Sequence, residues 1–241
     1  MTGILIIATV VMAWIVFRKR RPLVAWLATA SLIGVVGEGI LGGIVVAKEL
    51  SPWLVVVHLG LAMMILGFLV ATAVAAMPAS SGVPDLNFRR RAIVVTAATY
   101  VMMLTGSTVV ASGADDSCNS WPLCGGGFAL DFAGANAFTM LHRGTVLVVG
   151  LLLLHVLSKA LMRWRSVRGI GPIAVAAIVA FVLQVAVGAG SAITGSAVFD
   201  GLHVALATLV WSGVLATTLL TLPRADKDLG LSRLEVDRRS A

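Results

Sequence analysis

The chain has 241 residues, of which 59% are hydrophobic and 12% are charged, and its formal net charge at pH 7 is +7. Soluble domains carry roughly 25% charged residues, so this composition excludes a soluble enzyme and predicts an integral membrane protein. Lipid offers the backbone no hydrogen-bonding partner, and the alternating segments of a membrane barrel are absent from the sequence. We therefore expect an all-α fold.

Seven apolar segments are candidates for membrane-spanning helices, because a helix needs about 20 mostly apolar residues to cross the hydrocarbon core. The first is shorter than the others. In chain order, the predicted helices cover residues 3–17, 23–47, 53–77, 92–112, 138–161, 172–194 and 200–222. The predicted fold class is an all-α polytopic membrane protein with seven transmembrane helices.

Lysine and arginine gather in alternate connections between these helices. They follow the first, third, fifth and seventh segments, at residues 18–21, 89–91, 159–168 and 224–239, whereas the other connections contain only Lys48. Cytoplasmic loops of membrane proteins carry the excess of basic residues, so the positive charge needs no nucleic-acid partner. We expect a multi-pass protein of the bacterial inner (plasma) membrane, with a cytoplasmic C-terminus and the N-terminus outside.

Two stretches of the chain are similar to each other, residues 37–74 and residues 183–220. The alignment pairs Glu38 with Gln184, Gly42 with Gly188 and His58 with His203. Both copies cross the membrane in the same direction, as in the parallel repeats of membrane proteins. The predicted architecture is two parallel-repeat four-helix bundles, of which the first is incomplete.

The predicted domain boundaries follow from this repeat. The first copy has no counterpart of the second copy's opening helix, its outer loop or His142. We interpret the chain as an N-terminally shortened version of an eight-helix protein. The predicted units are an incomplete N-terminal bundle (1–78), a cytoplasmic linker (79–91), a complete C-terminal bundle (92–222) with an outer cysteine loop (113–137), and a cytoplasmic tail (223–241).

The two cysteines, Cys118 and Cys124, lie in an outer connection with the sequence GADDSCNSWPLCGG. This side of the membrane is oxidising, so the two thiols can form a structural disulfide. Closing so short a loop removes roughly 2–2.5 kcal/mol of unfolded-state entropy. A redox-active thiol pair is the alternative. Two cysteines without nearby histidines supply only half of a zinc site.

The four histidines are His58, His142, His155 and His203. At 1.5 Å per residue, three of them lie ~5–8 Å below the outer boundary, while His155 lies ~20 Å deeper and points away from His142. Ionisable residues within a membrane mark functional sites, although each histidine can also be a hydrogen-bonded packing residue. His142 and His203 share one predicted bundle, and two neutral imidazoles on facing helices suit heme iron. Asp200 is the one nearby carboxylate, at the interface or as a hydrogen-bond partner.

Arg143 follows His142 on the outer side, where a basic residue is unexpected. A heme propionate would satisfy its guanidinium, because arginine binds carboxylates with two parallel hydrogen bonds. The alternative is a salt bridge to one of the nearby aspartates, Asp115, Asp116 or Asp131.

Glu38 is predicted near the middle of the membrane, where its repeat copy has the neutral Gln184. It either forms a hydrogen bond between helices or acts in proton movement or substrate contact. The glycines around it and around Gly188 favour close helix approach, and they could also make room for a flat macrocycle. Several methionines are potential axial ligands, but methionine more often fills cores: Met63, Met64, Met102 and Met103.

Four motifs together resemble the heme A synthase family: SCNSWPLCGG in an outer loop, LHRG at the start of the next helix, then LQVAVGAG and GLHVAL. The resemblance covers residues 92–222 as one full unit and residues 1–77 as most of another. It implies two fused four-helix bundles and an oxidoreductase that converts the C8 methyl of heme O to a formyl group. The product, heme A, serves cytochrome oxidase.

The resemblance also implies roles for individual residues. His142 and His203 would hold a heme B cofactor, with Arg143 beside it, and His58 would ligate the iron of the substrate heme. The disulfide of this family is expected to relay electrons or to aid heme transfer, and Cys118 and Cys124 match it. The implied partners are heme O, the lipid bilayer, heme O synthase, cytochrome oxidase subunits and a second copy of the chain, which could complete the first bundle.

The sequence also departs from the family pattern. The His-Arg pair and the catalytic carboxylate of the first bundle have no counterpart here, and Thr139, three residues before His142, cannot replace that acid. Glu38 stands where glutamine is usual, and it is the one candidate catalytic residue. Two alternatives therefore remain, a bis-histidine heme B cytochrome and a heme-binding assembly subunit without catalysis of its own.

Overall fold

The computed structural model describes residues 2–49, 51–78, 84–126 and 128–223. Within these ranges the chain forms α-helices and no strand, which confirms the all-α prediction. The helices are α1 (Thr2–Phe17), α2 (Pro22–Ala47), α3 (Pro52–Ala76), α4 (Leu86–Ala111), α5 (Ala114–Ser117), α6 (Asn136–Trp164), α7 (Ile170–Thr194) and α8 (Ala197–Leu220). The predicted tail lies outside the described residues from position 224 onward, as do residues 79–83 of the predicted linker.

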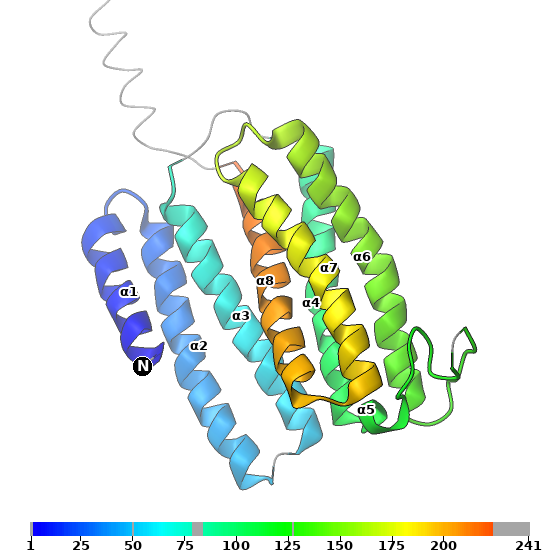
Figure 1. Ribbon diagram of the computed structural model, residues 1–241. Coiled ribbons are helices and arrows are strands. Elements are labelled where there is room, and N and C mark those ends of the chain that lie inside the picture. The colour runs from blue at the N-terminus through cyan, green and yellow to red at the C-terminus, as the bar shows by residue number, and fades with distance from the viewer. Residues whose placement is uncertain (1, 50, 79–83, 127, 224–241) are drawn as a thin grey trace, which may run out of the picture.

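Six of the described helices are long and apolar enough to cross a membrane, namely α2, α3, α4, α6, α7 and α8. The chain is therefore a multi-pass membrane protein, but a seventh span is not confirmed. Helix α1 has 16 residues, which corresponds to ~24 Å at 1.5 Å per residue, short of a hydrocarbon core of about 30 Å. Its N-terminal end lies about halfway along α2 and does not reach the far side of the bundle (Figure 1).

Local sequence signals set the helix boundaries. Pro22 and Pro52 open α2 and α3, where the missing N–H of proline costs nothing. Asp85 caps α4 by accepting a hydrogen bond from the Phe88 N–H at 2.8 Å. Because of this cap, α4 begins at Leu86, six residues before the predicted boundary at 92, and its first turns contain the basic cluster 89–91.

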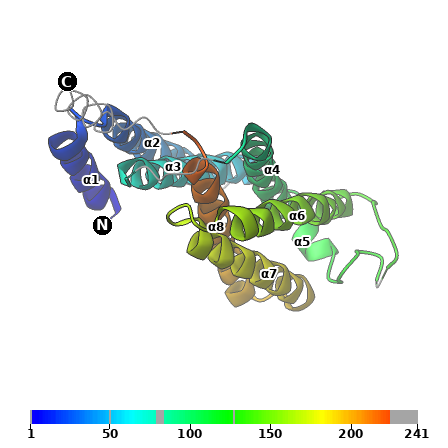
Figure 2. The same cartoon turned by 90° about the horizontal axis from the view of Figure 1, so that it is seen from above.

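Helices α4, α6, α7 and α8 pack around a shared apolar core, and α3 contacts both α4 and α8. Seen along the helix axes, α1, α2 and α3 extend from one side of this group (Figure 2). The indole N–H of Trp211 in α8 donates to the carbonyl of Met63 in α3 at 2.9 Å. This buried bond ties α3 to α8, and through α8 to the group of four helices.

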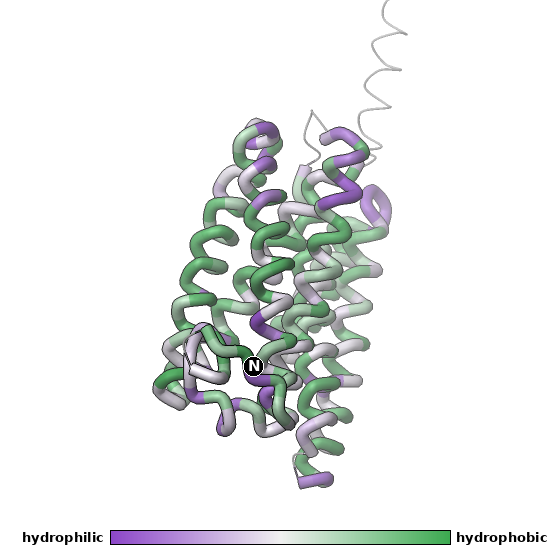
Figure 3. The backbone as a smooth tube through the Cα atoms, turned by 90° about the vertical axis from the view of Figure 1, so that its right-hand side faces the viewer, coloured by the Kyte–Doolittle hydropathy of each residue, from purple (hydrophilic) through white to green (hydrophobic). Residues whose placement is uncertain are grey.

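Hydrophilic residues gather toward the ends of the helices and hydrophobic residues fill their middle parts (Figure 3). We call the end that carries α5 and the disulfide the loop end. We call the opposite end, with residues 18–21, 89–91 and 159–168, the basic end. Helices α3, α6 and α8 all begin at the loop end (Figure 1).

Candidate functional site

Three histidines lie at equivalent positions near the loop end. His58, His142 and His203 are each the seventh residue of their helix, in α3, α6 and α8 respectively. At 1.5 Å per residue, each lies ~9 Å along its helix from the loop end. Sequence reasoning placed these three at a common depth, and the structure does so too. His155 is exposed on α6, 13 residues further along the chain than His142.

Each of these three histidines packs against a glycine of a neighbouring helix. A Cβ atom at Gly106 of α4 would lie 2.9 Å from Cε1 of His142, and one at Gly188 of α7 would lie 2.7 Å from Cε1 of His203. At Gly42 of α2 the corresponding distance to His58 is 3.4 Å. Because glycine has no side chain, the imidazole rings can lie directly on the helix backbone at these points.

The residue four positions before each glycine is also part of the site. The His142 ring interacts with the carbonyl of Met102, and the His203 ring interacts with the carbonyl of Gln184. Each imidazole therefore reaches a backbone carbonyl one turn away from its glycine.

At the third site the residue four positions before the glycine is Glu38, and its side chain contacts the histidine. Its Oε1 lies 3.1 Å from Nδ1 of His58. The two atoms are in contact without the alignment of a hydrogen bond, because Nδ1 of His58 has no hydrogen-bond partner and neither does Oε2 of Glu38. Glu38 thus faces the histidine and is available for a further proton or ligand.

His142 and His203 are near neighbours in the bundle. Their rings are close enough for an electrostatic interaction with each other. Nδ1 of His142 lies 3.1 Å from the Thr105 hydroxyl, which in turn lies 3.1 Å from the Thr145 hydroxyl. Nδ1 of His203 is buried without a hydrogen-bond partner. Hydroxyl groups thus orient the first imidazole, whereas the second approaches the Gln184 carbonyl without a well-formed hydrogen bond at Nδ1.

These features fit a heme iron with an imidazole on each face. A ligating histidine usually uses its other ring nitrogen for a hydrogen bond that orients it, and Thr105 provides one for His142. No three histidine, cysteine or carboxylate side chains are placed to hold a metal ion among the described residues. Two neighbouring imidazoles without a third ligand within the described ranges therefore suit a heme better than a non-heme metal.

Arg143 contacts the loop instead of an aspartate. Its Nη1 donates to the carbonyl of Pro122 at 3.0 Å, and in the described part of the chain it forms no ion pair with Asp115, Asp116 or Asp131. The salt-bridge interpretation is therefore wrong. Sequence reasoning missed the backbone carbonyl of Pro122 as a partner, because a carbonyl leaves no residue-type signal.

The loop itself is fixed at several points. Cys118 and Cys124 form the predicted disulfide, with a Cα–Cα distance of 5.0 Å. Asp131 accepts hydrogen bonds from the Ala133 N–H at 2.9 Å and from the Asn136 amide at 2.7 Å. These two hydrogen bonds lower the pKa of the Asp131 carboxyl below its usual value, and the bond from the Ala133 backbone N–H has the larger effect. The loop is therefore attached to the start of α6, two turns before His142.

Three further predicted candidates have structural positions. Asp200 accepts a hydrogen bond from the Ser191 hydroxyl across the α7–α8 connection and interacts electrostatically with His203. Met63 and Met102 are buried in the core, as expected of methionines that fill packing space. Sequence reasoning missed Thr105 and Thr145, since threonine is common in this chain and only the packing of α4 against α6 brings these two together.

Comparisons with known proteins give a consistent result. Residues 1–217 match the family described as cytochrome oxidase assembly protein. Heme A synthase of Shouchella clausii is 26% identical over 227 residues, which cover 91% of this chain and 73% of that protein. Heme A synthase of Geobacillus thermodenitrificans is 31% identical over 148 residues, which cover 59% of this chain and 45% of that protein.

A relative with a different name also matches. Protoheme IX farnesyltransferase 1 of Natronomonas pharaonis is 34% identical over 115 residues, which cover 47% of this chain and 23% of that protein. The matched regions thus span less than half of the Geobacillus and Natronomonas relatives.

Proposed function

The chain belongs to the family of cytochrome oxidase assembly proteins, which includes the heme A synthases, and on this premise we propose that it acts in heme A biosynthesis as an oxidoreductase. The proposed reaction converts the C8 methyl of heme O to a formyl group. The observation that carries the proposal is the pair His142 and His203, each packed on a glycine and within electrostatic range of the other.

In this proposal, His142 and His203 hold heme B. Thr105 orients the His142 ring through its hydroxyl, and Gly106 and Gly188 leave the room that the two rings need. Heme B, when bound, supplies one-electron transfer. Arg143 keeps the disulfide loop against the start of α6 through its bond to the Pro122 carbonyl.

His58 is the proposed ligand of the substrate heme, and Glu38 is the residue placed to serve it. Converting a methyl group and water to a formyl group releases four electrons and four protons, so a proton acceptor is required near the substrate. The Glu38 carboxylate lies 3.1 Å from the His58 ring and has one oxygen without a partner. It can therefore orient His58 or accept a proton close to the substrate.

A second candidate is a bis-histidine heme B cytochrome or a heme-binding assembly subunit that performs no oxidation. It is favoured by the asymmetry of the three sites. In the described part of the chain His142 faces another histidine, whereas His58 faces Glu38. In this reading the chain would bind one heme and transfer electrons.

The proposed partners follow from the reaction. They are heme O as substrate, heme O synthase as its source, cytochrome oxidase subunits as recipients, the lipid bilayer, and a second copy of the chain. The similarity to a relative named protoheme IX farnesyltransferase supports the link to a heme-modifying enzyme.

Heme extraction separates the two candidates. The full chain is expressed together with a heme O source, and the hemes of the membranes are extracted and separated by chromatography. The enzyme proposal predicts a formyl-heme peak that the empty vector does not give and that His58→Ala removes. Heme B alone, with unchanged heme O, would contradict the enzyme and support the cytochrome.

A further inference from the structure

A pocket lies at the basic end, between the start of α4 and the end of α6. It has a volume of about 360 Å³ and is lined by Asp85, Asn87, Phe88, Arg91, Lys159, Arg163 and Trp164. Arg163 lies 21 residues after His142 in the same helix, which corresponds to ~30 Å along α6. The pocket is thus separate from the histidine sites.

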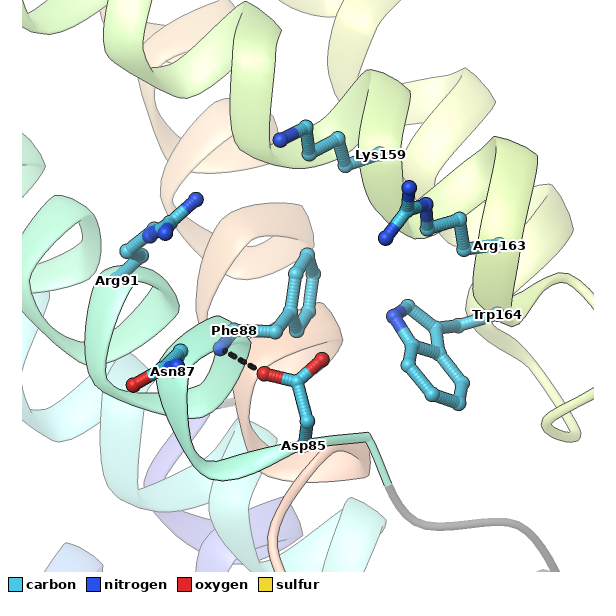
Figure 4. A pocket seen from close by; sticks show the side chains of 7 residues that line it. All are labelled: Asp85, Asn87, Phe88, Arg91, Lys159, Arg163 and Trp164. Atoms are coloured by element: carbon cyan, nitrogen blue, oxygen red, sulfur yellow. Dashed lines mark hydrogen bonds between the residues drawn. The ribbon is translucent and has the colours of Figure 1, made fainter.

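Three cationic side chains line this pocket from two helices. Lys159 and Arg163 are four residues apart on one face of α6, and Arg91 reaches in from α4 (Figure 4). Like charges four residues apart on a helix repel each other, so this arrangement costs free energy without an anion between them. None of the three forms an ion pair with another described residue.

The one acid in the lining does not neutralise them. Asp85 uses its Oδ1 to cap α4, accepting the Phe88 N–H at 2.8 Å (Figure 4). Asp85 contributes one negative charge against three positive ones, so the lining of the pocket keeps a net positive charge.

A fourth donor points to a ligand. The indole nitrogen of Trp164 is buried and has no hydrogen-bond partner, and it faces the interior of the pocket (Figure 4). Phe88 lies beside the indole ring, on the side of its nitrogen (Figure 4), with the ring centroids 6.3 Å apart. An orphaned indole donor beside three cations matches an anion with several acceptor oxygens.

The position of the pocket indicates which anion. It lies where two membrane-spanning helices meet the polar boundary, the depth at which lipid phosphates and tryptophan side chains gather. Basic pockets between membrane helices on the cytoplasmic side bind the head groups of anionic lipids. We propose that Arg91, Lys159, Arg163 and the Trp164 N–H bind the phosphate of an anionic phospholipid, such as a phosphatidylglycerol or a cardiolipin.

Native mass spectrometry of the full chain in detergent tests this proposal. The protein is titrated with phosphatidylglycerol, with cardiolipin and with phosphatidylcholine, and the affinity of the first bound lipid is measured. The anionic lipids should bind at least tenfold more tightly than phosphatidylcholine. Equal affinities would overturn the proposal.

Matched variants separate a pocket from general surface charge. Arg91→Gln, Lys159→Gln and Arg163→Gln together should weaken the first anionic lipid about tenfold or more. The control removes three exposed charges from the same end, through Arg18→Gln, Lys19→Gln and Arg20→Gln, and should change it less than threefold. Equal losses in the two triple variants would contradict a specific site.

One further variant and one competition experiment complete the test. Trp164→Phe retains the ring contact with Phe88 and removes the N–H, so it should weaken the anionic lipid several-fold at unchanged elution volume, and wild-type affinity would contradict its role. Inorganic phosphate in millimolar excess should not displace the lipid. Displacement would assign the pocket to free phosphate and overturn the lipid proposal.

Discussion

At the residue scale, the sites of His142 and His203 each depend on a glycine, because the ring lies where a side chain would otherwise be. A Cβ atom at Gly106 would approach Cε1 of His142 to 2.9 Å, closer than real Cβ contacts, so the ring would have to move. The same holds at Gly188 and His203. The glycines therefore fix the orientation of the imidazoles as much as the histidines' own positions do.

The first prediction concerns Gly106→Ala. Overpacking a tight contact costs about 1–3 kcal/mol, and 1.4 kcal/mol is a factor of ten in affinity, so heme affinity of the purified protein should fall roughly tenfold. Heme titration followed by absorbance measures it. The control is Gly37→Ala, since a Cβ there meets nothing within 4 Å. Equal heme affinities for these two variants would refute the glycine's role.

The second prediction concerns Glu38, which contacts His58 and neither of the paired histidines. Glu38→Gln keeps the size of the side chain and removes its charge. We expect the low-spin heme spectrum of the His142–His203 site to stay the same. The yield of formyl-heme in the co-expression assay should change little, because glutamine is the usual residue of the resembled family at this position and can still orient His58; a fall of about tenfold or more would instead identify Glu38 as a proton acceptor. Loss of the low-spin spectrum would show that Glu38 supports the other site instead.

At the scale of single elements, the disulfide loop is attached to the helices by polar contacts at each end. Arg143 of α6 binds the Pro122 carbonyl, and Asn136 accepts a hydrogen bond from Ser117 of α5 at 2.6 Å while donating to Asp131. The disulfide between Cys118 and Cys124 closes the middle of this segment. The loop is thus fixed against the first turns of the helix that carries His142.

The third prediction concerns the pH dependence of this loop. The pKa of Asp131 is lowered by the Ala133 N–H and then by the Asn136 amide. A lowered folded-state pKa means that the contribution is fully present above the usual aspartate pKa and is lost as pH falls through the lower folded value. Loop order should therefore be constant from pH 8 to pH 5 and decrease only in stronger acid.

Limited proteolysis of the purified protein at a series of pH values, with an acid-stable protease at the low end, measures this. Asp131→Ala should be cleaved between residues 125 and 135 at pH 7 as readily as the native chain is in strong acid. An onset of cleavage near pH 6 in the native chain would contradict the assignment to Asp131.

The sequence predicted most helix positions well, because apolar length is a strong signal in a membrane protein. The predicted third helix, 53–77, differs by one residue at each end from α3 (Pro52–Ala76). The start of α4 was missed by six residues, since arginines 89–91 read as a loop, while Asp85 caps the helix before them. Helix α5, with four residues, carries no hydrophobic signal and could not be predicted.

At the scale of the whole molecule, the packing of helices decides which histidines meet. The sequence predicted the common depth of His58, His142 and His203, since depth depends only on counting residues along a helix. It also indicated that His142 and His203 belong together. The glycine contacts and the Thr105 hydroxyl could not be read from it, because they depend on the rotation of α4 and α7 against their neighbours.

The whole molecule also has two distinct ends with different proposed ligands. The loop end carries the histidine sites and the disulfide loop, and the basic end carries a cationic pocket ~30 Å away along α6. A lipid phosphate at the basic end would hold α4 and α6 together at one end, while the proposed heme ligation would hold α6 and α8 together at the other. The two proposed sites therefore share α6 and lie at its opposite ends.

The central claim is that His142 and His203 together hold one heme, and the absorption spectrum of the purified full chain tests it most directly. The native protein should show a low-spin b-type heme spectrum. His142→Ala and His203→Ala should each abolish it, while His58→Ala should leave it in place. His155→Ala, which removes an exposed histidine from the same helix as His142, should also leave it in place. A low-spin spectrum that survives the loss of either His142 or His203, or that disappears with His155, would contradict this account.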